Sequence, residues 1–405
     1  DNVKRLRNHA SIGLWCGNNE NSEGWHRWGW QTDRSETEKE IIWNNYLKIF
    51  DSILPNTVSN LTDVNYWESS PKYGRGNPKY QFEGDAHDWW IWHDAYPFEH
   101  LEKRVPRFMS EFGMQSFPSY EVIRHINQNG SLNLTSKGLR NHQKHQRGFG
   151  LINTYMLRDF PVPLLEEDYI YMSQLVQAYG ITKGIEAQRR AKPYNMGTLF
   201  WQLNDCWPSI SWSSIDFFGN WKALHYKAKK AFENILVSSK VEGNLLKTFV
   251  INDRLNSVPL KLKLELIDFK GNKLWDNFKS IKCGGTSSTQ INSLNLNQMN
   301  LDHTNAIFVV SNDTSRWLHY FTNPKNLKLQ KEEIKKQIIK TSNGFTILLS
   351  SSTLQKDVFL FTKNKGHFSD NFLDLLPNET IKIHFKTTSK TLKDLSIKTL
   401  NQFLN

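Results

Sequence analysis

The hydrophobic pattern changes character about half-way along the 405-residue chain, and this change limits the folds that the chain can adopt. Up to about residue 235, short apolar runs alternate with segments of helical periodicity. Beyond that point apolar and polar residues alternate with period two, as in residues 260–266 (LKLKLEL). Thirteen of the fifteen tryptophans lie at or before Trp221. We therefore expect more than one domain: a part that mixes helices with strands, then a part built of strands.

The first part is predicted to be an α/β fold. Five short apolar segments have the character of strands, and four longer segments have helical spacing. The strands are expected at residues 11–16, 64–68, 80–84, 107–112 and 198–202, and the helices at 36–53, 98–105, 166–191 and 222–235. Strands that alternate with helices are typical of a parallel sheet with helices outside. Five strand–helix units, rather than eight, predict a partial (β/α)8 TIM barrel over residues 1–235.

The tail is predicted to form β-sandwich domains. Period-two segments with turns between them are expected as strands at residues 260–267, 273–278, 345–349, 358–362 and 380–385. Short alternating strands of this kind are typical of β-sandwiches. The lysine-rich residues 324–340 are expected to join two modules. We therefore place one β-sandwich domain at 236–325 and a second, incomplete one at 326–405.

The net charge of +11 does not predict a nucleic-acid partner. Beyond residue 240 most lysines alternate with apolar residues, so they are expected on the solvent faces of strands rather than in a dense basic patch. No apolar stretch approaches the ~20 residues of a membrane helix, so we expect no membrane partner. The three cysteines, Cys16, Cys206 and Cys283, have neither a disulfide nor a zinc spacing. Oligomeric state stays open.

Polar and acidic residues stand at the carboxyl ends of three predicted strands. Glu20 follows the first strand, Glu111 ends the fourth, and Trp201 ends the fifth. On a barrel these ends meet at one rim, where active sites lie. Two carboxylates ~5–5.5 Å apart serve retaining glycoside hydrolysis, one as acid/base and one as nucleophile. Taken singly, each glutamate fits a solvated surface group or ion-pair partner equally well; the tryptophans in polar segments favour a sugar-binding cleft.

Three segments resemble the signature segments of β-mannosidases in glycoside hydrolase family 2, in the same order and with similar spacing. They are LWCGNNEN at 14–21, FMSEFGMQSFPS at 108–119 and FWQLNDCWP at 200–208. The tail segment GHFSDNFLDLLPNET at 366–380 is similar to the terminal β-sandwich of that family. The resemblance implies the C-terminal portion of such an enzyme: the second part of the catalytic barrel followed by immunoglobulin-like sandwich domains.

The resemblance also implies roles for individual residues. Glu20 would be the general acid/base and Glu111 the nucleophile. Asn19 would bind the 2-hydroxyl of the sugar, Trp201 would line the subsite, and Trp28 would shape its entrance. No metal site and no organic cofactor are implied.

The sequence departs from the family pattern where a tyrosine usually contacts the nucleophile. The corresponding segment, GDAHDWWIWH at 84–93, has no tyrosine. His87, His93 and Tyr96 are candidates for that contact, and His93 is our choice.

The expected activity is that of a retaining exo-β-mannosidase. It would remove terminal non-reducing β-D-mannose from oligosaccharides or glycan fragments, in an extracytoplasmic compartment. Two alternatives stay open: a family-2 glycosidase for another β-linked sugar, and a non-catalytic carbohydrate-binding fragment.

Overall fold

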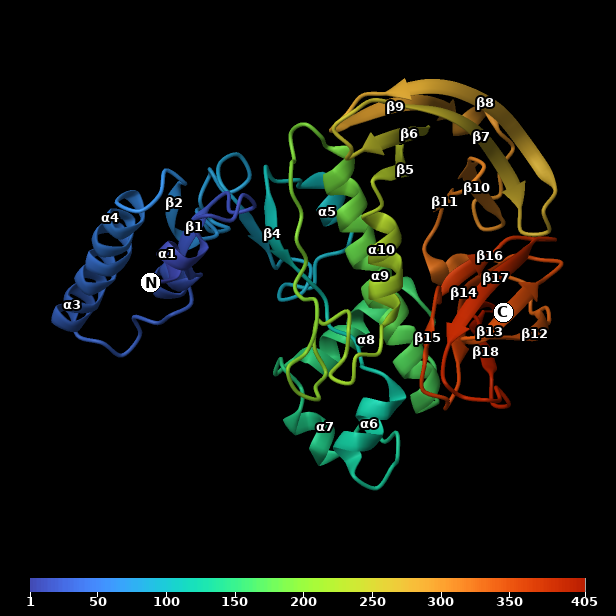
Figure 1. Cartoon of the computed structure of the whole chain (residues 1–405), viewed down its shortest axis with the longest axis horizontal. Helices are drawn as coiled ribbons and strands as arrows, with labels where there is room; N and C mark the ends of the chain where they lie inside the picture. The colour runs from blue at the N-terminus through green and yellow to red at the C-terminus, as the bar shows by residue number, and fades with distance from the viewer. Residues whose placement is uncertain (405) are drawn as a thin grey trace.

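The computed structural model describes residues 1–404, and its elements follow the change of pattern in the sequence (Figure 1). The first part holds the helices α1 to α10 and the strands β1 to β4. Its elements are α1 (Asn2–Leu6), β1 (Trp15–Asn19), α2 (Asn21–Arg27), α3 (Glu36–Leu47), a π-helical turn (Lys48–Ile53), α4 (Leu54–Ser59), β2 (Tyr66–Ser70), β3 (Ala86–Asp88), α5 (His100–Lys103), β4 (Met109–Phe112), α6 (Tyr120–Asn127), α7 (Lys137–Asn141), α8 (Gly148–Asp159), α9 (Glu166–Arg190) and α10 (Ala223–Ala231).

The strands of the first part pair in parallel, as the strand–helix alternation predicts. β1 pairs with β2, and β3 pairs with β4. Thr198 adds a parallel bridge to Met109 of β4, and this bridge is all that forms of the strand predicted at residues 198–202. In a parallel pair the carboxyl ends of both strands lie on the same side, so residues that follow these strands can meet.

The predicted strand at residues 80–84 is wrong. These residues form turns, closed by backbone bonds from Tyr80 N to Asn77 O (3.0 Å) and from Phe82 N to Lys79 O (2.9 Å). Gly84 has a φ of +71°, which extended backbone does not use. The strand in this region is β3, which begins at Ala86.

The long helix α9 is the centre of the core. It begins with three acidic residues and ends with Arg189 and Arg190, so both ends complement the helix dipole. Sixteen of its 25 residues are buried. Gly184 lets β4 approach closely, because a Cβ there would lie 2.6 Å from the ring of Phe112. The same core continues into the tail through Phe372 and Leu400.

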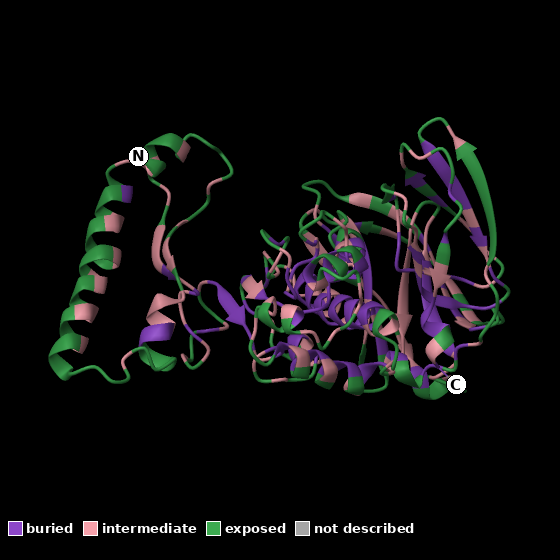
Figure 2. Cartoon of the chain, turned by 90° about the horizontal axis from the view of Figure 1, so that it is seen from below, coloured by how far each residue is buried: buried purple, intermediate pink, exposed green. Residues whose placement is uncertain are grey.

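Residues 1–68 lie apart from this core (Figures 1 and 2). Only Gly24, Trp25 and Val58 are buried in this segment, whereas buried residues are dense beyond Ser69 (Figure 2). Large apolar side chains of the segment face solvent, among them Ile41 and Ile53 at 54% and 50% exposure. Across residues 1–404, no helix combines the length and the apolar character that crossing a membrane requires.

The tail consists of antiparallel sheets. Its strands are β5 (Ile235–Glu242), β6 (Leu245–Asn252), β7 (Val258–Asp268), β8 (Lys273–Cys283), β9 (Ser287–Asn295), β10 (Ala306–Ser311), β11 (Arg316–Tyr320), β12 (Lys335–Thr341), β13 (Gly344–Ser350), β14 (Gln355–Phe361), β15 (His367–Phe368), β16 (Leu373–Leu375), β17 (Thr380–Lys386) and β18 (Ser396–Lys398). Sheets ordered β5-β6-β9 and β11-β10-β7-β8 enclose one core, and sheets ordered β12-β13-β17-β15 and β16-β14-β18 enclose another.

The stretch at 324–340 is only in part the connection that the sequence predicts. A short 3-10 helix occupies Pro324–Asn326, but β12 begins at Lys335 and pairs along its length with β13. β12 is an edge strand whose residues are almost all exposed, and lysines on an edge strand discourage pairing with another chain. Its lysines are therefore compatible with a strand.

Candidate active site

Glu20 stands at the corner between β1 and α2. The register of the β1–β2 pair sets Asn19 opposite Ser70, and the backbone N–H of Glu20 donates to the carbonyl of Ser70 at 2.8 Å. The φ of Glu20 is +60°, in the left-handed region that residues with a side chain seldom occupy. Such strained positions concentrate at functional sites. Its side chain is 16% exposed and points toward β3.

Glu111 lies within β4, between the fully buried Met109 and Phe112 on the strand. The indole N–H of Trp89 donates to Glu111 Oε2 at 3.3 Å. Burial raises the pKa of the Glu111 carboxyl, and the nearby Glu20 adds to the rise, while His87 and the Trp89 hydrogen bond oppose it. The side chain is 13% exposed, so the carboxyl group is largely withdrawn from water.

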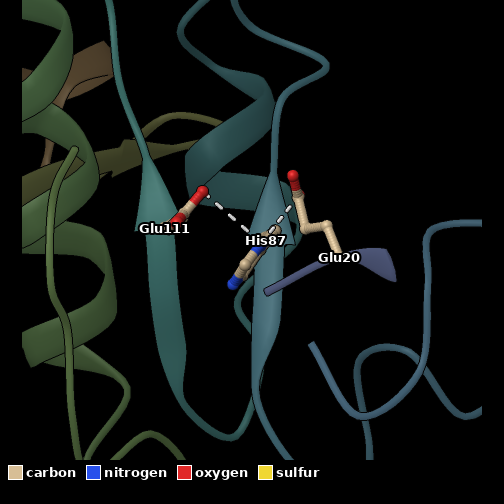
Figure 3. Close-up of side chains that lie close together, drawn as sticks. All are labelled: Glu20, His87 and Glu111. Atoms are coloured by element: carbon tan, nitrogen blue, oxygen red, sulfur yellow. Dashed lines mark hydrogen bonds and ion pairs between the residues drawn. The ribbon is translucent and has the colours of Figure 1, made fainter. Parts of the chain in front are cut away.

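The ring of His87 lies between the two glutamates (Figure 3). Its Nδ1 is 2.7 Å from Glu20 Oε1 and 3.4 Å from Glu111 Oε2. His87 is on β3, where the β3–β4 register sets it directly opposite Glu111. The three atoms that these residues present lie within 4.8 Å of one another. Two carboxylates from distant parts of the chain thus share one histidine and one small space.

A chain of hydrogen bonds supports the other edge of that ring. His87 Nε2 is 3.0 Å from Ser70 Oγ, which in turn donates to Asp85 Oδ2 at 2.5 Å. Asp85 also accepts from Ser110 Oγ at 2.6 Å and from the backbone N–H of Lys72 at 2.9 Å. These bonds link the end of β2 to β3 and β4, and the bond between Ser70 and His87 fixes the orientation of the imidazole.

Comparison with known proteins shows which proteins this chain resembles. A family of Ig-fold domains of mannosidases matches residues 329–403, and a mannosidase Ig/CBM-like domain family matches residues 244–326. Beta-mannosidase B of Thermothelomyces thermophilus is 26% identical over 97% of this chain and 51% of its own length. Beta-mannosidase B of Aspergillus clavatus is 31% identical over 60% of the chain and 30% of its own length.

A solved structure extends the likeness to three dimensions. The beta-D-mannosidase of Dictyoglomus thermophilum superposes with a TM-score of 0.86 and 31% identity, covering 98% of this chain and 49% of that one. The chain belongs to the β-mannosidases of glycoside hydrolase family 2. It spans about half the length of the relatives that match it end to end.

Two further residues predicted for the site have backbone positions next to the glutamates. The backbone N–H of Trp201 donates to the carbonyl of Phe112 at 2.8 Å, which sets Trp201 beside the end of β4. Its side chain is 41% exposed and free to contact a ligand. Asn19 directly precedes Glu20 and is also exposed, whereas its neighbour Asn18 is engaged by Glu68 and Ser69.

Trp28 lies at the end of α2, the helix that Glu20 begins. It is 48% exposed, and its ring meets Trp30 edge to face at 5.9 Å between centroids. Its side of the site is formed by residues 1–68, which have little core of their own. A role for Trp28 at the entrance stays a prediction.

The choice of His93 as the partner of the nucleophile is wrong. Its Nδ1 is 3.2 Å from His145 Nε2, and burial together with His145 lowers the pKa of His93 to about 4. Tyr96 is also elsewhere: its ring meets the ring of His100 edge to face, with 5.2 Å between the centroids. The structure sets His87 and Trp89 beside Glu111 instead. The reason is register, because β3 is only three residues long and its pairing with β4 leaves no periodic trace in the sequence.

The cluster has the ligand types of a metal site, although the sequence predicts none. Glu20, His87 and Glu111 each present one ligand atom, and within residues 1–404 no second group of three such residues lies this close together. The expectation of no metal therefore stays a prediction.

Proposed function

We propose that the protein containing this chain is a retaining exo-β-mannosidase, which removes terminal β-D-mannose from the non-reducing ends of oligosaccharides or glycan fragments. One observation carries the proposal: one carboxylate oxygen of Glu20 and one of Glu111 lie within 4.8 Å of each other, and Trp89 donates a hydrogen bond to Glu111. Retaining glycosidases hold their carboxyl groups ~5–5.5 Å apart, whereas inverting enzymes hold theirs ~6.5–9.5 Å apart to admit a water molecule. The spacing favours retention.

The two glutamates would divide the chemistry. Glu20 protonates the leaving oxygen while Glu111 attacks the anomeric carbon and forms a covalent mannosyl-enzyme. Glu20 then removes a proton from water, which displaces Glu111 with net retention. Trp89 stabilises the ionised form of Glu111 through its indole N–H, as a nucleophile requires. Asn19 would bind the 2-hydroxyl, Trp201 would line the subsite, and Trp28 would shape its entrance.

The parallel pairs support a partial (β/α)8 barrel for residues 1–235. β1 with β2, β3 with β4, and the bridge at Thr198 all run parallel. Glu20 and Glu111 then belong to strands of one rim, as in barrel enzymes. The remaining strands would come from residues outside this chain.

Mannose as the sugar rests on the relatives, which are named beta-mannosidases in two fungi and in Dictyoglomus thermophilum. A panel of aryl β-glycosides tests this choice, because the same pair of carboxylates would cleave other β-linked sugars. A clear preference for the mannoside is expected. A preference for another sugar would leave the proposed mechanism in place and change the proposed substrate.

An extracytoplasmic location is part of the proposal, and cell fractionation tests it.

The decisive experiment changes one carboxylate at a time in the full-length product of the gene that encodes this chain. Glu111→Ala should abolish hydrolysis of an aryl β-mannoside, because no nucleophile remains. Glu20→Ala should still cleave an aryl β-mannoside with a good leaving group, because that group needs no protonation. It should release little phenol from an aryl β-mannoside with a poor leaving group. Glu83→Gln is the matched control, since Glu83 is exposed and pairs with Lys79.

The configuration of the first sugar released checks the mechanism. Proton NMR during hydrolysis should show β-mannose before mutarotation. Undiminished turnover by Glu111→Ala, or α-mannose as the first product, would refute the assignment of a retaining pair.

A further inference from the structure

His87 meets different partners at its two ring nitrogens. Nε2 lies 3.0 Å from Ser70 Oγ, and Nδ1 lies 2.7 Å from Glu20 Oε1 and 3.4 Å from Glu111 Oε2. The side chain is only 3% exposed. Because water reaches so little of the ring, these neighbours decide which nitrogen carries a proton.

Ser70 settles the state of Nε2. A serine hydroxyl has one proton to donate, and Ser70 Oγ lies 2.5 Å from Asp85 Oδ2. A carboxylate only accepts, so the hydroxyl proton of Ser70 points at Asp85. The backbone N–H of Lys72 also donates to Asp85, at 2.9 Å, and keeps it an acceptor. The oxygen of Ser70 is left to accept, and therefore Nε2 of His87 carries a proton.

The state of Nε2 has a consequence at Nδ1. When Nε2 is protonated, the neutral ring offers only a lone pair at Nδ1. A separation of 2.7 Å between Nδ1 and Glu20 Oε1 is a short hydrogen bond, and a hydrogen bond needs one proton between its two atoms. Glu111 Oε2, at 3.4 Å from the same nitrogen, is the more distant partner. Glu20 and His87 thus share one proton.

We infer that His87 is a positioning residue that holds the catalytic proton at Glu20 and leaves Glu111 as the nucleophile. Ser70 and Asp85 impose this role by fixing a proton on Nε2. The inference rests on the proposed function and adds to it a reason why two carboxyl groups in one small space take different roles. Geometry assigns Glu20 as the acid, because His87 Nδ1 lies 2.7 Å from Glu20 Oε1 and 3.4 Å from Glu111 Oε2.

The proton count balances over both steps. In the first step the shared proton moves to the leaving oxygen as the glycosidic C–O bond breaks and the bond from Glu111 to the anomeric carbon forms. In the second step the oxygen of water bonds to that carbon, the bond to Glu111 breaks, and a proton of water returns to the Glu20–His87 pair. His87 itself touches neither the anomeric carbon nor the leaving oxygen.

The first test measures the tautomer in this 405-residue chain. With ¹⁵N-labelled histidine, the signals of His87 are assigned by their loss in His87→Gln, and two-bond couplings then show which nitrogen is protonated. We expect Nε2 to be protonated in the wild-type chain, and the protonation to become mixed in Ser70→Ala. Ser110→Ala is the matched control, because Ser110 donates to the same Asp85 oxygen without touching His87. Protonation at Nδ1 alone would overturn the inference.

The second test measures the use of the proton, in the full-length gene product. The value of kcat/KM is compared for aryl β-mannosides with good and poor leaving groups. Ser70→Ala should lose about tenfold or more on a poor leaving group, and much less on a good one, since general-acid catalysis contributes ~10²–10⁴-fold and matters only for the former. Ser70→Thr keeps a hydroxyl and should restore the poor substrate. Ser110→Ala should keep the wild-type ratio between the two substrates.

The outcomes separate this inference from the proposed function. The role of His87 would be overturned if Ser70→Ala lost kcat/KM equally on good and poor leaving groups. It would also be overturned if Ser110→Ala changed the ratio between the two substrates as much as Ser70→Ala does. If the wild-type protein cleaves no aryl β-mannoside, the proposed function fails, and the tautomer measured in the chain still confirms or contradicts the hydrogen-bond assignment. If Ser70→Ala does not fold, Ser70→Thr provides the test. Loss of the Nε2 proton in Ser70→Thr contradicts the hydrogen-bond assignment, and retention of that proton supports the assignment.

Discussion

Four charged side chains join helix α10 to the second sandwich, and Lys227 contributes the charge from the helix. Its Nζ lies 2.9 Å from Asp357 Oδ1 and 3.8 Å from Asp374 Oδ1. Lys356 contacts the same two aspartates at 2.9 and 3.8 Å, and Tyr320 donates to Asp374 Oδ2 at 3.0 Å. The two aspartate side chains are 6% and 7% exposed, so they depend on these partners for compensation.

Lys227→Met removes one positive charge and leaves two buried negative charges beside one lysine. Breaking a buried ion pair costs ~3–5 kcal/mol. Lys227 is 24% exposed and Lys356 stays in place, so we expect about 2–3 kcal/mol. The matched control is Lys230→Met on the same helix, because its pair with Asp370 at 2.7 Å is half exposed and is worth below ~1 kcal/mol.

The assay is amide hydrogen exchange in peptides that cover α10 and β14, which reports local opening of this contact. A loss of about 2–3 kcal/mol speeds exchange by about 30- to 150-fold at neutral pH, since ~1.4 kcal/mol is tenfold. Lys230→Met should change the rates by less than about fivefold. Equal effects of the two substitutions would refute the reasoning.

The pH dependence gives a second criterion for the same variant. Burial would raise the pKa of Asp374, but Lys227 and Lys356 outweigh it and hold that pKa below the ordinary value. A lowered folded-state pKa means that the stabilisation is complete above the unfolded value of ~3.9 and is lost as the pH falls. The difference between wild type and Lys227→Met should therefore shrink below about pH 4. If the stability difference between wild type and Lys227→Met stayed constant into strong acid, the ion pair would not be the origin of that difference.

Two further predictions follow from the packing and the histidines. Gly184→Ala sets a Cβ 2.6 Å from Phe112 and 2.8 Å from Leu101, and should lose about 1–3 kcal/mol of stability. Gly150→Ala lies on the exposed face of α8, where nothing is within 4 Å of the added Cβ, and should leave stability unchanged or raise it by about 0.5–1 kcal/mol. Calorimetric melting that finds Gly184→Ala more stable than Gly150→Ala would contradict this packing. His93, whose pKa burial lowers to about 4, should stay neutral from pH 5 to 8 in an NMR titration, and a midpoint near 6.5 would place it in water instead.

Much of the fold could be predicted because its signals are local. The helix expected at 166–191 is α9 (Glu166–Arg190), and the strand expected at 260–267 lies within β7 (Val258–Asp268). Periodicity over more than ten residues predicts such elements well. The failures are short: residues 80–84 form turns that backbone bonds close, and the three residues of β3 are too few to show a period.

The site divides in the same way. The sequence by itself determined that Glu20 and Glu111 stand at or near strand ends, because strand ends and turns depend on neighbouring residues. Trp201 was expected to end a strand of which only the bridge at Thr198 forms. Only the tertiary structure decided that His87, rather than His93, lies between the two carboxylates. That contact depends on the register of β3 against β4 and on Ser70 and Asp85, which meet across separate strands. Pairing between distant strands is an energy of the whole fold, so no stretch of sequence encodes it alone.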